Sequence, residues 1–390
     1  MTIDPPVVSA AERRRVIVSG YIVRRPLGGG VFCTLQYALG LLRLGHDVWF
    51  FEDSEDYPAC YDPTRHVTDT DPAYGLRFAG EVLDHYGLGA RWCYYDAHTD
   101  RWLGPCAAHA RSICATADVV ITASGRLRPW TAEVPRRVFV DKDPLFAQAM
   151  YLRDASRRAA VAQHNAFFTY GHNIPAGTTE VPDDGFAWRA LRQPVVLDIW
   201  KVAPPPEPGQ GRYTTLMQWN AYPPAEIGGQ HYGLKSHAFG PFEDLPQRVD
   251  VGLELAVGGS EVPRERLRRF GWHITDPLLP SRSPAEFQRY LAASRGEFTV
   301  AKHGYVAART GWFSERAAHY LASGRPVITQ DTGFTEWLPA GDGLLAFSTS
   351  DQAVAALQEV ERRHAHHCRA ARELVAEYFD ARKVLPALLD

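Results

Sequence analysis

The sequence lacks the features that mark a membrane protein, a disulfide-rich secreted domain or a nucleic-acid-binding protein. No stretch approaches the roughly 18 uninterrupted apolar residues of a transmembrane helix, and residues 1–15 lack the apolar core of a signal peptide. The six cysteines form no Cys-x-x-Cys pair, which excludes a zinc ribbon and a disulfide framework. A net charge of −3 leaves no excess of positive charge for a nucleic-acid backbone. We therefore predict a cytoplasmic monomer or homodimer without a membrane span or a nucleic-acid partner.

Lysine is also scarce, since only five of the 42 lysine and arginine residues are lysine. Such a bias is typical of a GC-rich genome and by itself indicates no chemistry. Apolar residues make up 45% of the chain and charged residues 22%, which is ordinary for a globular protein. At 390 residues the chain is too long for one typical core and suits two domains of roughly 150–200 residues each.

Short apolar segments alternate with helical patterns from residue 15 onward. Residues 15–23, 46–53, 136–144 and 165–173 have the composition of strands, and residues 32–45 have the apolar spacing of a helix. This alternation predicts βαβ units and a parallel sheet. In such sheets ligands collect at the carboxyl ends of the strands, so the turns after these strands are expected to carry the functional residues.

A linker interrupts the pattern at residues 203–211, "APPPEPGQG", whose four prolines and two glycines suit neither a helix nor a central strand. Strand-like segments resume after it and continue to about residue 331. We therefore predict an α/β fold with two Rossmann-like domains that face a central cleft. The expected boundaries are 1–195 for the N-terminal domain and 196–372 for the C-terminal domain, with a helix over 373–390 that returns to the first.

A glycine-rich segment, "RRPLGGGVF" at residues 24–32, follows the first strand and opens the first helix. Successive glycines let the backbone approach a ligand closely, and a helix start favours an anion. The order of the glycines is not the G-x-G-x-x-G of dinucleotide-binding proteins, so an NAD-dependent dehydrogenase is only a distant alternative. A purely structural turn explains this segment equally well.

The most informative stretch is "GWFSERAAHYLASGRPVITQDTGFTEW" at residues 311–337, a helix, a short strand and a glycine turn joined closely. Ser314 is placed to cap the helix, which would point the next amides at a phosphate. Glu315 and Glu336 are acceptor-only carboxylates that suit sugar hydroxyls, and residues 331–333 form a polar turn. The structural alternative is a helix and a strand with solvated polar ends.

This stretch resembles the C-terminal donor-site motif of GT-B-fold glycosyltransferases, especially the retaining group that includes the glycogen and sucrose synthases. The matching positions are Gly324, Pro326, Val327, Ile328, Gly333, Glu336 and "GDGLLAF" at 341–347. The resemblance covers most of the chain and is strongest from about residue 250 to 350. It implies a hexosyltransferase that moves a sugar from a UDP-, GDP- or dTDP-sugar to a small-molecule acceptor, for example in antibiotic or other natural-product biosynthesis.

The resemblance also implies where the substrates bind. The acceptor would enter from the N-terminal domain, and the donor would lie mainly on the C-terminal domain. Its base is expected near residues 271–274, its diphosphate between Lys235, the helix start at 314 and the glycines, and its sugar near Gly333. The complete expected donor site is Gly28, Gly29, Gly30, Lys235, Trp272, His273, Ile274, Lys302, His303, Ser314, Glu315, Asp331, Thr332, Gly333, Phe334 and Glu336.

Two departures from the family pattern affect the mechanism. The retaining group carries two glutamates at positions where this chain has Gly311 and His319, with Glu315 between them. Either Glu315 replaces the ligand of the donor ribose, or the donor is held differently. The catalytic histidine that inverting relatives carry after the first strand is also absent from "SGYIVRRPLGGG".

Candidate catalytic bases are therefore sought in other turns of the N-terminal domain. Asp141 and Asp143 follow a strand in "VFVDKDPLF", and His172 follows the next strand in "FTYGHNIP". All three also fit ordinary turn roles.

We predict no metal and no cofactor besides the donor. No Asp-x-Asp pattern lies where metal-dependent glycosyltransferases of the other common fold use one, and residues 364–368, "HAHHC", fit a solvated helix face. Helix amides and basic residues would then stabilise the leaving diphosphate. A sugar-nucleotide epimerase of the same fold and a catalytically silent activator subunit remain as alternatives.

Overall fold

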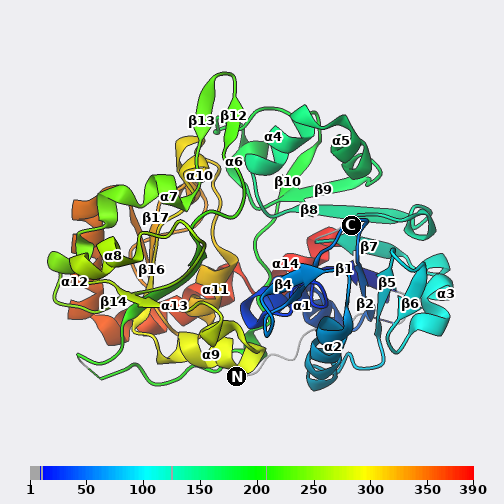
Figure 1. Ribbon diagram of the computed structural model, residues 1–390, viewed down its shortest axis with the longest axis horizontal. Coiled ribbons are helices and arrows are strands. Elements are labelled where there is room, and N and C mark those ends of the chain that lie inside the picture. The colour runs from blue at the N-terminus through cyan, green and yellow to red at the C-terminus, as the bar shows by residue number, and fades with distance from the viewer. Residues whose placement is uncertain (1–8, 10–11, 124–125, 208) are drawn as a thin grey trace.

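The computed structural model describes residue 9 and residues 12–123, 126–207 and 209–390, and it contains two α/β domains side by side (Figure 1). The N-terminal domain lies on the right of this view, the C-terminal domain on the left, and the C-terminus returns to the N-terminal domain. Both have parallel sheets covered by helices, which confirms the predicted α/β architecture. Pro208 of the predicted linker lies outside the described residues.

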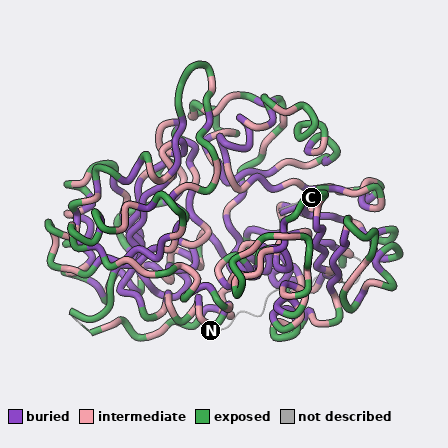
Figure 2. Tube along the Cα trace, in the orientation of Figure 1, coloured by how far each residue is buried: buried purple, intermediate pink, exposed green. Residues whose placement is uncertain are grey.

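The N-terminal domain is built on an eight-stranded sheet of order β10-β9-β8-β7-β1-β2-β5-β6, parallel except for the edge strand β6. Its interior strands are rich in Val, Ile and Phe and are almost wholly buried (Figure 2). The strands are β1 (Arg15–Ser19), β2 (Asp47–Asp53), β5 (Trp92–Asp96), β6 (Arg101–Leu103), β7 (Val119–Thr122), β8 (Arg136–Asp141), β9 (Ala166–Thr169) and β10 (Trp188–Ala190), with a separate hairpin of β3 (Cys60–Asp62) and β4 (Val67–Asp69). The helices are α1 (Gly28–Arg43), α2 (Ala73–His85), α3 (Ala110–Ala115), α4 (Phe146–Arg153), α5 (Ala155–Val161) and α6 (Asn173–Ala176).

The C-terminal domain has a six-stranded, fully parallel sheet of order β15-β14-β11-β16-β17-β18. Its strands are β11 (Tyr213–Gln218), β14 (Leu253–Gly258), β15 (His273–Thr275), β16 (Gly296–Thr299), β17 (Val327–Gln330) and β18 (Leu344–Phe347), with a hairpin of β12 (Ala225–Ile227) and β13 (Gln230–Tyr232). The helices are α7 (Lys235–Ala238), α8 (Arg264–Phe270), α9 (Pro284–Ala293), α10 (His303–Ala307), α11 (Glu315–Ala322), α12 (Ser350–Arg362), α13 (His364–Tyr378) and α14 (Ala381–Val384).

The end of the chain packs on the N-terminal domain. The backbone of Val195 donates to the Phe379 carbonyl at 2.7 Å, and the Ala381 amide donates to the Val195 carbonyl at 2.9 Å. Helix α14 then lies against α1, where a Cβ on Gly40 would come within 2.8 Å of the Ala381 Cβ. One buried apolar cluster consequently runs from the N-terminal sheet through α1 into α9, α11 and α13.

The glycines predicted to form a ligand-binding loop are instead the first turn of α1. This helix begins at Gly28 rather than at the predicted residue 32. A Cβ on Gly28 would lie 2.1 Å from the Ser283 carbonyl oxygen, and one on Gly29 would lie 2.9 Å from the Phe287 ring, both at the start of α9. Glycine is therefore needed here for close packing between the two domains.

An aromatic cluster extends this contact. The rings of Trp200 and His319 stack with centroids 4.6 Å apart and an interplanar angle of 15°, and Phe32 and Phe287 pack around them. His319 is buried, and burial lowers its pKa to about 3. The residue at the position of a family glutamate is therefore a neutral core histidine.

His172, one of the predicted catalytic residues, is a domain contact as well. Its ring stacks on Trp337 of the C-terminal domain, with centroids 3.8 Å apart and planes at 11°. Its Nε2 lies 3.2 Å from the Leu191 carbonyl oxygen, which requires a proton on Nε2. Burial lowers the pKa of His172 to about 4.

We expect Gly28→Ala to destabilise the protein, because the new Cβ would collide with backbone of α9. Overpacking of this kind costs about 1–3 kcal/mol in the free energy of unfolding. Gly30→Ala is the matched control, since nothing lies within 4 Å of its Cβ position and alanine is the better helix former by up to about 1 kcal/mol. Denaturant unfolding of both variants measures the difference; equal stabilities would contradict the packing role of Gly28.

We expect the free energy of unfolding to fall as the pH drops from about 6.5, the usual histidine pKa, towards about 4, the value for folded His172. In this pH range His172 takes up a proton in the unfolded chain but stays neutral in the folded protein. Its contribution to the free energy of unfolding is therefore fully present above the range and is lost below it. His172→Gln should reduce the slope of stability against pH. The same substitution at exposed His109 is the control, and an unchanged slope in His172→Gln would refute the assignment.

Candidate functional site

A cavity of about 350 Å³ lies between the two domains. The N-terminal domain lines it with Cys33 of α1 and with Lys142 and Asp143, which follow β8. The charged or polar side chains from the C-terminal domain are Gln218, Lys235, Lys302, Tyr305, Ser314, Glu315 and Arg316. We call this cavity the interdomain cleft. It lies where strands of both sheets end, as expected for ligand sites in parallel α/β folds.

Basic side chains are concentrated in this cleft. Lys142, Lys235 and Lys302 are three of the five lysines in the whole sequence, and Arg316 adds a fourth basic side chain. Only two carboxylates, Asp143 and Glu315, are among the described residues that line it. The arrangement suits a ligand that carries more than one negative charge.

Arg316 was not anticipated from the sequence. Its Nε lies 2.5 Å from Glu297 Oε1, Nη1 donates to the Leu216 carbonyl at 2.6 Å, and Nη2 donates to Thr299 Oγ1 at 2.9 Å. Glu297 is fully buried within β16, and burial raises the pKa of its carboxyl group while Arg316 opposes that rise. A glutamate that is fully buried in a strand requires such a cation, and this was the signal that could have revealed Arg316.

Lys235 opens α7 and lies half-buried in the cleft, with Nζ 3.4 Å from Thr299 Oγ1. Burial lowers the pKa of Lys235 well below its ordinary value, and the nearby charges of Arg316 and Lys302 lower it further. An anionic ligand would reverse both charge effects. His303 does not line the cleft, but its Nδ1 accepts from the Gly233 amide at 3.1 Å and so positions the turn before Lys235.

Lys302 pairs with Asp143 across the domain boundary, with Nζ and Oδ1 2.7 Å apart. The hydroxyls of Tyr222 and Tyr305 also donate to the Asp143 carboxylate. Burial, with the charge of Asp143 next in importance, raises the pKa of both tyrosines, so both remain donors. Both oxygens of Asp143 are therefore engaged, which leaves it poorly placed to take a proton from an acceptor.

Asp141 does not reach the cleft. It is buried and accepts from Gln148 Nε2 at 3.1 Å, from Thr169 Oγ1 at 2.9 Å and from the Asp143 amide at 2.9 Å. Burial raises its pKa to about 6. Its contacts shape the turn that carries Lys142 and Asp143, and they argue against the catalytic role expected from the sequence.

Glu315 is the first residue of α11, directly after Ser314, whose Oγ accepts from the Ala317 amide at 3.4 Å as expected for a cap. Both residues line the cleft. Tyr170, at the end of β9 in the N-terminal domain, donates its hydroxyl to Glu315 Oε1 at 3.3 Å. The Tyr170 hydroxyl is also 2.5 Å from that of Tyr37.

The polar turn at residues 331–336 lies outside the cleft lining, contrary to the expected contact with the donor sugar. Gly333 has φ +86°, and a Cβ there would come within 2.6 Å of Asn173 Nδ2 in the N-terminal domain. The remaining members of the turn are also occupied by protein. Asp331 accepts from the Gly333 amide at 2.9 Å, Thr332 donates to the Trp312 carbonyl at 2.5 Å, Phe334 is buried, and Glu336 pairs with Arg309 and accepts from Thr178 at 3.0 Å.

The expected base site at residues 271–274 also lies outside the cleft lining. Trp272 is buried, and its Nε1 donates to the Glu243 carbonyl at 2.8 Å, so it belongs to the domain core. His273 is exposed, 3.8 Å from Glu254, and Ile274 is half-buried in β15. The loop after β15 borders a second interdomain cavity of about 360 Å³.

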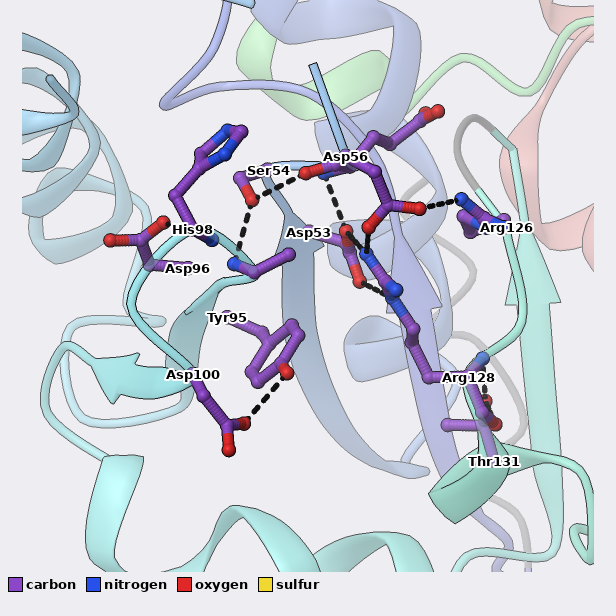
Figure 3. Close-up of polar contacts among 12 residues, drawn as sticks. Asp53, Ser54, Asp56, Tyr95, Asp96, His98, Asp100, Arg126, Arg128 and Thr131 are labelled. Atoms are coloured by element: carbon purple, nitrogen blue, oxygen red, sulfur yellow. Dashed lines mark hydrogen bonds and ion pairs between the residues drawn. The ribbon is translucent and has the colours of Figure 1, made fainter. Parts of the chain in front are cut away.

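A second charged cluster lies at the carboxyl end of β2 (Figure 3). Arg128 donates to both oxygens of Asp53, at 2.6 and 2.8 Å, and to Asp56 at 3.0 Å. Beneath these ion pairs, Tyr95 and Trp130 line a space of about 30 Å³, little more than one water needs.

The histidines near residue 364 have structural partners, since His364 Nε2 contacts the Arg295 carbonyl at 2.7 Å and His367 accepts from the Gly343 amide at 3.1 Å. Within the described residues, no group of three or more His, Cys, Asp or Glu side chains is arranged to hold a metal ion. No helix in that same part of the chain is both long and apolar enough to cross a bilayer.

No protein-family profile matches the sequence. No curated protein matches it either. Solved structures, in contrast, match over nearly the full length. HepE of Anabaena in complex with UDP-glucose has a TM-score of 0.57 at 12% identity, with 96% of this chain and 98% of HepE covered.

Two further solved structures show the same arrangement. An α-glucosyltransferase in complex with UDP and a 13-mer DNA has a TM-score of 0.57 at 11% identity, covering 95% of this chain and 97% of its own. Sucrose-phosphate synthase of Thermosynechococcus elongatus has a TM-score of 0.50 at 15% identity, with 96% of each chain covered. Because these matches extend through both domains, this chain has the GT-B fold of glycosyltransferases.

Proposed function

We propose that this chain is a glycosyltransferase that moves a sugar from a nucleoside-diphosphate sugar to a small-molecule acceptor, with the diphosphate bound in the interdomain cleft. The observation that carries the proposal is the convergence of Lys142, Lys235, Lys302 and Arg316 on that cleft. HepE was solved with UDP-glucose and the α-glucosyltransferase with UDP, so UDP-glucose is the first donor to test.

The cations would act in the chemical step as well as in binding. When the bond between the sugar and the diphosphate breaks, negative charge grows on the leaving oxygen. Lys235 and Arg316 are positioned before the reaction, Arg316 by its three hydrogen bonds, so little reorganisation is needed. We propose that these side chains replace the metal ion that other glycosyltransferases use.

The acceptor would approach from the N-terminal domain, on the side of Cys33 and Lys142. One structural neighbour was solved with DNA, yet this chain has a net charge of −3, which favours an acceptor other than a polyanion. A small molecule, as in natural-product biosynthesis, fits this charge and the cleft volume of about 350 Å³.

We expect UDP-glucose, GDP-glucose or dTDP-glucose to raise the melting temperature and to be cleaved slowly by water. A donor at 100 times its dissociation constant stabilises the folded state by about 2.7 kcal/mol. Thermal shift and chromatographic detection of the released nucleotide measure the two effects. Binding without release would favour a silent activator, and formation of an epimerised donor would identify an epimerase. No binding by any donor would refute the proposal.

We expect Lys235→Ala to weaken donor binding about 10- to 100-fold, because the half-buried amino group that would pair with the diphosphate is lost. Lys201→Ala, at an exposed lysine that lies outside the cleft, is the matched control. Isothermal titration calorimetry measures both affinities.

Donor binding should also take up a proton, because the free cleft lowers the pKa of Lys235 and the diphosphate would restore the charged form. Affinity should therefore decrease as the pH rises. Titrations in buffers of different ionisation enthalpy detect the proton, and the effect should disappear in Lys235→Ala. Proton uptake of equal size in that variant would exclude Lys235 as its source.

A further inference from the structure

The two carboxylates of the interdomain cleft have different surroundings. Asp143 is held by Lys302 and by two tyrosine hydroxyls. Glu315, in contrast, has no Lys, Arg or His nitrogen within 4.0 Å among the residues that the structure describes. Its neighbour Arg316 instead bonds to Glu297 and the Leu216 carbonyl. Glu315 is thus the cleft carboxylate whose charge is not already neutralised by an ion pair.

A chain of buried hydroxyl groups fixes the position of Glu315. Tyr170 lies 3.3 Å from Glu315 Oε1 and 2.5 Å from the hydroxyl of Tyr37, and neither tyrosine is exposed. Burial raises the pKa of both tyrosines well above the ordinary value, so both keep their protons. Since Tyr170 donates to Glu315, Tyr37 must donate to Tyr170. The chain therefore orients the Glu315 carboxylate through a hydrogen bond to one of its oxygens.

Glu315 also lies where a helix begins. It is the first residue of an eight-residue helix, where the exposed amides stabilise a negative charge. Cys33 of α1 lies beside it, and after burial the charge of Glu315 is the main influence that raises the pKa of the Cys33 thiol. Glu315 thus belongs to the C-terminal domain but faces the N-terminal side, from which the acceptor is proposed to enter.

We propose that Glu315 is the general base that deprotonates the acceptor hydroxyl, and that Tyr170 is its positioning residue. This inference rests on the proposed function. Glu315 takes the proton of the acceptor O–H group, and the acceptor oxygen forms a bond with the anomeric carbon. The bond from that carbon to the diphosphate oxygen breaks, and its electron pair leaves on the diphosphate beside Lys235 and Arg316.

The proposal has a structural consequence for domain closure. The base is on one domain and the hydroxyl that orients it is on the other, so the pair exists only when the domains are in contact. Separated domains would leave Glu315 without its hydrogen bond from Tyr170, and they would slow proton transfer from water or from any other acceptor substrate to Glu315. A nucleotide sugar bound while the two domains are apart would thereby be protected from hydrolysis.

Cleavage of UDP-glucose, with water as the acceptor, tests the base. We expect Glu315→Gln to lower kcat for UDP release at least about 100-fold, with KM for UDP-glucose nearly unchanged. With a carboxylate as the base, kcat for UDP release should decline at acid pH. This decline should vanish in Glu315→Gln and should persist in Glu315→Asp. Glu265→Gln is the matched control, because Glu265 occupies the first turn of α8 and is exposed. Calorimetry with UDP-glucose checks that each variant is folded.

Tyr170→Phe tests the positioning role. Loss of the hydroxyl should reduce kcat roughly 10-fold, the equivalent of one hydrogen bond to a charged group, and should move the acid limb of the rate profile to higher pH. Tyr37→Phe should shift the profile in the same direction by a smaller amount. A change in kcat without any shift of the acid limb would indicate a structural role only and would overturn the positioning role.

The outcomes separate the two proposals. If the unaltered chain cleaves UDP-glucose and Glu315→Gln cleaves it equally fast, Glu315 is not the base and the proposed function survives. If Glu315→Gln raises KM and keeps the acid limb, Glu315 binds a sugar hydroxyl and the base assignment is wrong. If the unaltered chain neither binds nor cleaves any of the three donors, the proposed function itself fails and the assignment of Glu315 fails with it.

Discussion

The close approach of α1 to α9 determines how the two domains face each other. Without side chains on Gly28 and Gly29, the first turn of α1 rests directly on Ser283 and Phe287. The stacked pair of Trp200 and His319 fills the space behind this contact. A side chain at Gly28 would separate the domains, so the spacing of every group across the cleft depends on this packing.

The charges in the cleft are then divided between the domains in a way that neither domain achieves alone. The C-terminal domain supplies Lys235, Lys302 and Arg316, and the last of these neutralises the buried carboxylate of Glu297. The N-terminal domain supplies Asp143, which pairs with Lys302, and Tyr170, which orients Glu315. A buried carboxylate without its cation would be strongly destabilising, so β16 and α11 are coupled in stability as well as in the site.

The sequence predicted the fold and part of this site because both depend on local patterns. Alternating strands and helices identified the two domains, and Lys235, Lys302, Ser314 and Glu315 all line the cleft. Gly28, Gly29 and the turn that begins at residue 331 were predicted as ligand contacts, but protein atoms occupy those positions. A glycine lets either a ligand or a neighbouring helix approach the backbone closely, because it has no Cβ. The sequence alone therefore does not show which of the two lies against it.

By itself, the sequence determined the order of the elements, the cap of α11 at Ser314 and the residue types available for anion binding, since hydrophobic periodicity and helix capping act over a few residues. Only the tertiary structure decided which basic side chains line the cleft together, because Lys142 and Lys235 are far apart in the chain. The scarcity of lysine became informative only once three lysines were found in one cavity. It also decided the states of Asp143 and Glu315. Whether a carboxylate is neutralised by an ion pair or oriented by a hydroxyl depends on groups that only the folded chain brings within bonding distance.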